Sequence, residues 1–216
     1  MFNYNLFLQR LSNSKLSKQS FIKNEIAQRL LMRLDLLKIT PNNILVTGYT
    51  DKDYIRLLNS RFPDSKIFFK NNDSYFDLII SNSIIHMTYS IDDEITSYYK
   101  KLNNDGILIF STIGNKSFKT LNKCFDSLDT KPHTNQFIDL LTWGNTLQAS
   151  QLKNTVIESE IITFTYKKIK TLFSDIRDLN EPLADTKMHK GLTGKNKWKL
   201  FKIELIKHLQ LEIEAL

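Results

Sequence analysis

Polar residues follow each of two short apolar runs, in positions suited to binding a ligand. The residues after the first run, 76–80, are Ser81, Asn82 and Ser83. The residues singled out after the second run, 107–110, are Ser111, Thr112 and Gly114. Continuous apolar runs of this kind are typical of strands buried on both faces of a parallel sheet, and ligands bind beyond the carboxyl ends of such strands. The two polar groups are therefore predicted to lie on neighbouring positions of one rim.

The segment between the two runs has the pattern of an amphipathic helix. Within 92–102, apolar and aromatic residues recur at a spacing of three to four. Asn103 to Gly106 (N-N-D-G) is expected to end this helix, with Gly106 in the left-handed conformation. Strand, helix and strand within about forty residues form a βαβ unit, whose connection is right-handed.

Further elements are expected on both sides of this unit. Helices are predicted at 21–37, 52–62, 116–128, 137–147, 173–179 and 197–208. Strands are predicted at 43–47, 66–69 and 156–166, and the alternating end L-Q-L-E-I-E-A-L is expected to form an antiparallel edge strand.

Composition favours an intracellular protein and leaves two interpretations of its positive charge. The 216 residues are sufficient for one domain and contain no apolar run long enough to span a membrane. The beginning lacks a secretion signal, and the lone Cys124 fits a reducing, cytoplasmic location. The formal net charge of +7 suits an anionic partner, which would be nucleic acid, an anionic membrane surface or an acidic protein. Nucleic acid is less favoured because the basic residues are scattered. On composition alone, a solvated surface is the preferred interpretation. Histidines, Cys124 and carboxylates lack metal-ligand spacing, so no metal site is predicted.

Several segments together are similar to one enzyme family. They are F-D-L-I-I-S-N-S-I-I-H-M at 76–87, L-N-N-D-G-I-L-I-F-S-T-I-G-N-K-S-F at 102–118, N-E-I-A-Q-R-L-L-M-R-L-D-L-L-K-I at 24–39, H-T-N-Q-F-I-D at 133–139 and K-G-L-T-G-K at 190–195. In the same order and over most of the chain, they resemble malonyl-[acyl-carrier protein] O-methyltransferases of biotin synthesis. These are class I enzymes that use S-adenosylmethionine (SAM).

The resemblance implies an architecture and two sets of site residues. The fold would be α/β, a class I methyltransferase-like (Rossmann-like) sheet, mostly parallel, with one antiparallel strand near its edge. Residues 1–40 would form a helical lid over an α/β domain at 41–216, and the substrate would be a malonyl-loaded acyl carrier protein. The cofactor residues would be Gly48, Ser81, Asn82 and Ser83. The substrate residues would be Lys116, His133, Asn135 and Phe137, although Asn135 could equally cap the following helix.

The cofactor half departs from the family pattern. After the first strand the family has a glycine-rich loop, preceded by an acidic residue, which lets the backbone approach SAM closely. Here Gly48 is kept in G-Y-T-D-K, but Thr50 and Lys52 stand where further glycines belong, and Val46 replaces the acid. Lys70 stands where a carboxylate would bind the ribose hydroxyls.

A whole helix-strand unit is also expected to be missing. Only the six residues 70–75 separate Phe69 from Phe76, whereas a βαβ unit takes roughly 30 residues. The second strand would then be an edge strand, which the lysines Lys66 and Lys70 fit. Asp73 is the nearest acid that could replace the ribose carboxylate, but a turn residue is the preferred interpretation.

Two functional hypotheses follow from the resemblance and the departures. In the first, the protein is an enzyme that methylates the free carboxylate of a malonyl thioester, and no residue is predicted to act as a catalytic base. In the second, it is a catalytically inactive relative that binds an acyl carrier or a partner subunit without using SAM. The departures at Val46, Thr50, Lys52 and Lys70 favour weak or absent binding of SAM by the isolated chain.

Overall fold

The computed structural model describes residues 2–13, 19–70, 74–188, 191 and 193–216, which form two compact units. The first, here called the parallel unit, comprises 21–113, 140–158 and residue 216. The second, the antiparallel unit, comprises 1–20, 114–139 and 159–215. We describe each unit by itself. No helix in the described part of the chain is long and apolar enough to cross a membrane.

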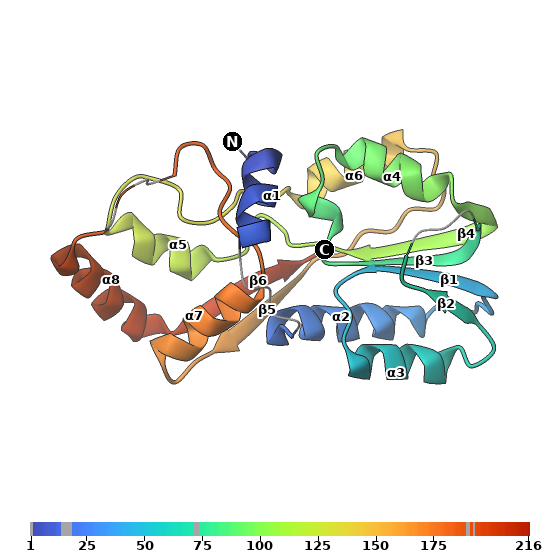
Figure 1. Cartoon of the computed structure of the whole chain (residues 1–216), viewed down its shortest axis with the longest axis horizontal. Coiled ribbons are helices and arrows are strands. Elements are labelled where there is room, and N and C mark those ends of the chain that lie inside the picture. Colours follow the sequence, from blue (N-terminus) through green and yellow to red (C-terminus); the bar gives the residue numbers. More distant parts are fainter. Residues whose placement is uncertain (1, 14–18, 71–73, 189–190, 192) are drawn as a thin grey trace. The chain divides into compact units, whose positions relative to one another are not determined.

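The parallel unit is built on a sheet of four parallel strands (Figure 1). In spatial order these are β2 (Lys66–Phe68), β1 (Asn43–Gly48), β3 (Phe76–Asn82) and β4 (Leu102–Ser111). The apolar residues of β1 and β3 are almost completely buried, as their continuous runs predict. Within the described residues no strand lies beyond β2, so its predicted position at the edge is confirmed.

Helices cover both faces of this sheet (Figure 1). On one face, α2 (Phe21–Leu34) and α3 (Lys52–Arg61) pack on each other and share an apolar core with β1 and β3. On the other face lie α4 (Ile91–Tyr99) and α6 (Leu140–Ala149). A short 3-10 helix, η1 (Ile85–Met87), follows β3. These elements confirm the predicted α/β class and the βαβ unit.

The link from α4 to β4 differs from its prediction. The strand begins at Leu102, so the N-N-D-G segment lies within it as an irregularity between the pairs Phe76↔Leu102 and Leu78↔Ile107. Asp105, with φ 60°, takes the left-handed conformation that we predicted for Gly106. The segment is held to β3 because the side chain of Asn103 donates a 2.6 Å hydrogen bond to the carboxylate of Asp77.

The described residues of the antiparallel unit form a two-stranded sheet and four helices. Strand β5 (Glu160–Thr165) pairs antiparallel with β6 (Gln210–Ala215). The final strand is antiparallel as predicted, but its ladder partner is β5 in a separate sheet rather than an edge of the parallel sheet. The helices are α1 (Tyr4–Asn13), α5 (Lys119–Asp126), α7 (Ile169–Asp178) and α8 (Lys195–His208).

Helix boundaries were predicted less well than helix positions. Helix α5 begins at Lys119 instead of Lys116 because Phe118 has a φ of 60°, outside the right-handed helical region. The proposed division into a lid at 1–40 and a domain at 41–216 stays a prediction. Residues 14–18 of this lid lie outside the described residues.

Candidate functional site

Three strands of the parallel unit end level with one another. The register pairs Gly48 of β1 with Asn82 of β3, and Asn82 with Ser111 of β4. The structure therefore brings Gly48 together with Ser81, Asn82 and Ser83 at the carboxyl edge of the sheet, where ligands bind in open α/β folds.

Gly48 is required by the close approach of β3. Its φ of +82° is unfavourable for other residues, and an added Cβ atom would lie 2.1 Å from the carbonyl oxygen of Asn82. Beyond this contact, the backbone N–H of Tyr49 donates to the Asn82 carbonyl at 2.8 Å, and the Asn82 amide donates to the Tyr49 carbonyl at 2.9 Å. Asn82 thus holds the turn that leaves β1.

The other polar side chains of this rim are buried and bonded within the protein. The hydroxyl of Ser111 donates to the Asn82 side-chain oxygen at 3.0 Å, and the Ser83 N–H donates to the Ser111 hydroxyl at 3.1 Å. Tyr98 donates to the hydroxyl of Ser81 at 3.2 Å, and burial raises the pKa of the Tyr98 phenol. Because Ser81, Asn82 and Ser83 are at most 1% exposed, they shape the rim more than they present groups to solvent.

Other polar and charged residues lie around this edge. Asp51 caps α3 by accepting the N–H of Tyr54 at 2.7 Å. The hydroxyl of Thr112 lies 2.9 Å from Nδ1 of His86. After the end of β2 lies the exposed Lys70, and residues 66–70 contain no acid. Asp73 lies outside the described residues.

Three of the four predicted substrate residues line one cavity in the antiparallel unit. The cavity has a volume of about 280 Å³. His133, Asn135 and Phe137 lie in its wall, whereas Lys116 does not. Its apolar wall is made by Phe118, Leu121, Phe125, Phe137, Phe173, Ile176, Leu179, Pro182 and Leu183, and its polar residues are His133, Thr134, Asn135, Arg177, Asn180 and Glu181.

The polar residues of this wall have defined partners. The ring of His133 stacks on Phe125 with centroids 4.3 Å apart, and its Nε2 lies 3.0 Å from the carboxylate of Asp129. Asn135 donates to the carbonyl of Pro182 at 3.0 Å and accepts the N–H of Ala184 at 2.8 Å. The alternative interpretation of Asn135 as a helix cap is wrong, since α6 begins only at Leu140.

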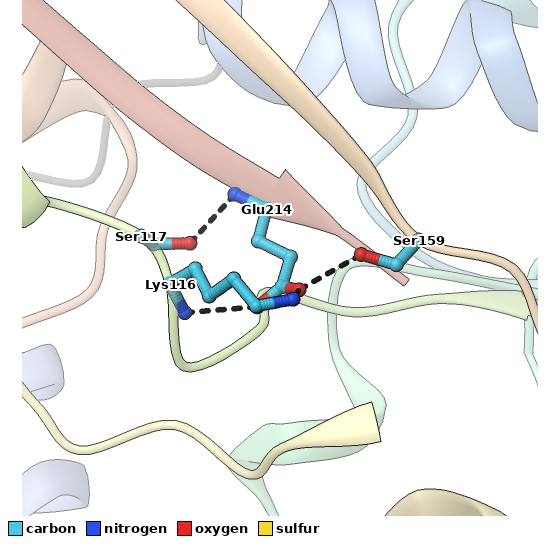
Figure 2. Close-up of polar contacts among 4 residues, drawn as sticks. All are labelled: Lys116, Ser117, Ser159 and Glu214. Carbon is cyan, nitrogen blue, oxygen red and sulfur yellow. Dashed lines mark hydrogen bonds and ion pairs between the residues drawn. The ribbon is translucent and has the colours of Figure 1, made fainter. Parts of the chain in front are cut away.

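Lys116 lies instead at a buried carboxylate that the sequence did not indicate (Figure 2). Its ammonium is 2.9 Å from Oε1 of Glu214, and its backbone N–H donates to Oε2 at 2.8 Å. Ser159 donates to Oε1 at 2.8 Å, and the Glu214 N–H donates to the hydroxyl of Ser117 at 2.8 Å. Burial would raise the pKa of Glu214, but the hydrogen bonds from Lys116 and Ser159 outweigh it and hold the pKa below its ordinary value.

Glu214 was missed because its burial has no local signal. In β6 the apolar residues Leu211 and Ile213 alternate with polar ones, so alternation predicts an exposed Glu214. Its side chain is 0% exposed because the segment 114–118 runs beside β6, and the Gly114 N–H donates to the Glu214 carbonyl at 2.7 Å. An added Cβ at Gly114 would lie 2.4 Å from the Glu214 carboxylate. Among the residues that the structure describes, no three histidines, cysteines or carboxylates are grouped to hold a metal ion.

Comparison with known proteins confirms the resemblance and the fold class. No protein-family profile matches the chain. A malonyl-[acyl-carrier protein] O-methyltransferase of Legionella pneumophila is 25% identical over 214 residues, covering 85% of this chain and 75% of the relative. One from Laribacter hongkongensis is 22% identical, covering 84% and 74%. A solved Bacillus halodurans structure named as a methyltransferase has a TM-score of 0.50 and 14% identity, covering 88% and 94%.

Proposed function

We propose that this protein is a SAM-dependent methyltransferase that methylates the free carboxylate of a malonyl thioester carried by an acyl carrier protein. The observation that carries the proposal is the similarity to malonyl-[acyl-carrier protein] O-methyltransferases over 85% of the chain, together with the class I methyltransferase-like sheet. The relatives' name also implies a role in biotin synthesis, which we include in the proposal.

The chemistry requires positioning more than proton transfer. SAM, when bound, supplies an electrophilic methyl group. A malonyl carboxylate is already a nucleophile, so no residue has to act as a general base, and the chain's task is alignment and exclusion of water. This agrees with a site whose polar residues are tied into the protein rather than free to shuttle protons.

The residues at the carboxyl edge of the parallel sheet fit SAM in part. The tight turn at Gly48 and the rim of Ser81, Asn82 and Ser83 lie where cofactors bind in folds of this class. The ribose end does not fit, because Lys70 replaces the carboxylate that would accept hydrogen bonds from the hydroxyls. We therefore expect weak affinity for SAM in the isolated chain, and a partner subunit that completes the ribose site would strengthen it.

The cavity of the antiparallel unit supports a thioester substrate. Its volume of about 280 Å³ is close to the smallest ligand pockets and suits a short acyl group rather than a long chain. The phenylalanine rings give it an apolar wall, and His133, Asn135 and Phe137 are proposed to contact the bound group. Lys116, whose side chain is 63% exposed, is proposed to attract the malonyl carboxylate.

A methyl-transfer assay tests this function. The chain is incubated with SAM labelled in its methyl group and with malonyl-loaded carrier protein, and acetyl-loaded carrier, which lacks the free carboxylate, serves as the control. We expect base-labile label on the malonyl carrier alone. Equal label on both carriers, or none on either at saturating SAM, would refute the proposal.

A substitution in the cavity wall tests whether the substrate binds in the cavity. Phe137→Ala removes apolar surface from the cavity wall, and a loss of about 1.4 kcal/mol of binding free energy would raise KM for the malonyl carrier roughly tenfold. Phe21→Ala, which removes an exposed phenylalanine of α2, is the matched control and should leave KM unchanged. Equal KM values for the two variants would show that the substrate does not bind in the cavity.

The second candidate function is binding of an acyl carrier or partner subunit without catalysis. The replacements at Thr50, Lys52 and Lys70 are the observations that favour it. Calorimetric titration separates the two candidates: absence of SAM binding at millimolar concentration, with binding of the carrier retained, would select the inactive protein.

A further inference from the structure

Helix α8 concentrates the positive charge of the chain. Its 14 residues contain five lysines and one acid, Glu204, which is a net charge of +4 out of the formal +7 of the whole protein. Glu204 pairs with Lys207 at 2.6 Å. The four other lysines are exposed, and no ion pair engages them within the described residues: Lys195, Lys197, Lys199 and Lys202.

The same helix exposes an apolar stripe. Leu200, Ile203 and Ile206 are 60%, 49% and 57% exposed, and their spacing of three places them along one face. The opposite face carries Phe201 and Leu205, both 0% exposed, which anchor α8 to its unit. The buried face of α8 is sufficient for folding. The helix therefore has a second apolar face that folding does not require, and lysines lie along its edges. Exposed apolar surface with a polar rim is typical of a protein-binding site.

The inner face of α8 supports the proposed substrate cavity. Phe201 stacks on Phe125 with centroids 4.5 Å apart, and Phe125 stacks in turn on His133. Trp198 lies 5.9 Å from Phe173 by ring centroids. Because Phe125 and Phe173 line the cavity, α8 forms the layer directly behind its aromatic wall. A partner seated on α8 would therefore be next to the cavity.

We propose that the outer face of α8 is the docking surface for an acidic acyl carrier protein, whose thioester-bearing arm reaches the neighbouring cavity. This inference rests on the proposed function, which supplies the partner. The lysines would accelerate encounter with an acidic carrier through long-range attraction. Leu200, Ile203 and Ile206 would provide the apolar contact that holds the complex after encounter.

The first test reverses the charge of two lysines beside the apolar stripe. We expect Lys199→Glu with Lys202→Glu to weaken binding of fluorescently labelled malonyl carrier protein roughly tenfold at low salt, with a smaller effect at high salt. The matched control is Lys38→Glu with Lys66→Glu, which makes the same change in net charge at exposed positions of the parallel unit. Equal weakening by the two pairs would show that net charge alone is responsible and would overturn the docking site.

The second test removes the apolar stripe. Leu200→Gln with Ile203→Gln keeps helix-forming residues at exposed positions, so the fold should persist. We expect weaker carrier binding at all salt concentrations. Wild-type affinity in this variant would overturn the apolar contact.

A kinetic comparison separates this inference from the proposed function. Both α8 variants should raise KM for the malonyl carrier but leave turnover of the malonyl thioester of free pantetheine unchanged. Failure of the wild type to methylate either substrate would refute the proposed function. Turnover of both substrates with an unchanged carrier KM in the α8 variants would refute the docking surface alone.

The same experiments also test two other binding partners for the outer face of α8. Wild-type binding to phosphatidylglycerol vesicles that is lost in the α8 variants, without carrier binding, would assign the face to a membrane surface. A dimer that Leu200→Gln with Ile203→Gln converts to a monomer would assign it to a second copy of this chain. Either result would overturn the proposal.

Discussion

Replacing Glu214 by glutamine tests whether its buried carboxylate holds the antiparallel unit together. The carboxylate accepts three hydrogen bonds, two from Lys116 and one from Ser159 (Figure 2). Glutamine keeps the shape but turns one acceptor oxygen into a donor, so at least one of these donors loses its acceptor. A hydrogen bond to a charged group contributes about 1.5–3 kcal/mol, and an unsatisfied buried donor costs about 1–3 kcal/mol. We expect the free energy of unfolding to fall by about 3 kcal/mol, or the Tm by roughly 6–12 °C.

Urea unfolding at pH 7 measures this loss, with Glu158→Gln as the control. Glu158 forms an ion pair with Arg33 and its side chain is 61% exposed, so its replacement should cost less than about 1 kcal/mol. Similar losses in the two variants would refute the role assigned to Glu214.

The pH dependence gives a second criterion. Because the folded pKa of Glu214 lies below its ordinary value of 4.5, its contribution is fully present above pH 4.5 and is lost as the pH falls through the folded value. The difference in unfolding free energy between wild type and Glu214→Gln should therefore narrow below pH 4.5. A difference that stays constant or widens in acid would contradict the pKa direction.

Three further substitutions test other parts of the structure. Gly48→Ala places a Cβ against the Asn82 carbonyl at a left-handed φ and should cost about 2–4 kcal/mol in urea unfolding. Gly144→Ala, inside α6 with the nearest atom at 3.6 Å, is the control and should not destabilise the protein. Asn135→Ala removes both hydrogen bonds to the 182–184 segment and should cost about 2 kcal/mol, which an unchanged urea midpoint would disprove. Lys70→Asp restores an acceptor for ribose hydroxyls, so calorimetry should show tighter SAM binding; equal or weaker binding would argue against that position for the ribose.

Regular elements could be predicted from the sequence because their signals are local. The apolar runs predicted as strands at 43–47 and 76–80 lie within the buried strands β1 and β3. The amphipathic spacing in 92–102 and 21–37 corresponds to the helices α4 and α2. The short connection after Phe69 predicted the edge position of β2, since a chain of six residues cannot hold another helix and strand. Order along the chain and right-handed connection then determine the parallel sheet.

Features that depend on residues far apart in sequence were decided only by the tertiary structure. No residue close to Glu214 in the sequence indicates that it is buried, because the segment that covers it lies about a hundred residues earlier in the chain. Asn135 was ambiguous for the same reason, as its partners are Pro182 and Ala184. A side chain's role in such contacts depends on which segment packs over it, and that is a property of the whole fold.

The lysines of α8 show what the amino-acid sequence reveals and what only the tertiary structure adds. The residues themselves are visible in the sequence, where 187–202 is a basic segment and Lys195 and Lys197 are predicted to contact the carrier surface. The structure shows that Phe201 and Leu205 bury one face of the helix. Leu200, Ile203 and the lysines therefore lie exposed on the rest of it, where a partner can contact them. Helical periodicity places apolar residues around the axis, but only packing against Phe125 and its neighbours decides which of them face the core and which remain for a partner.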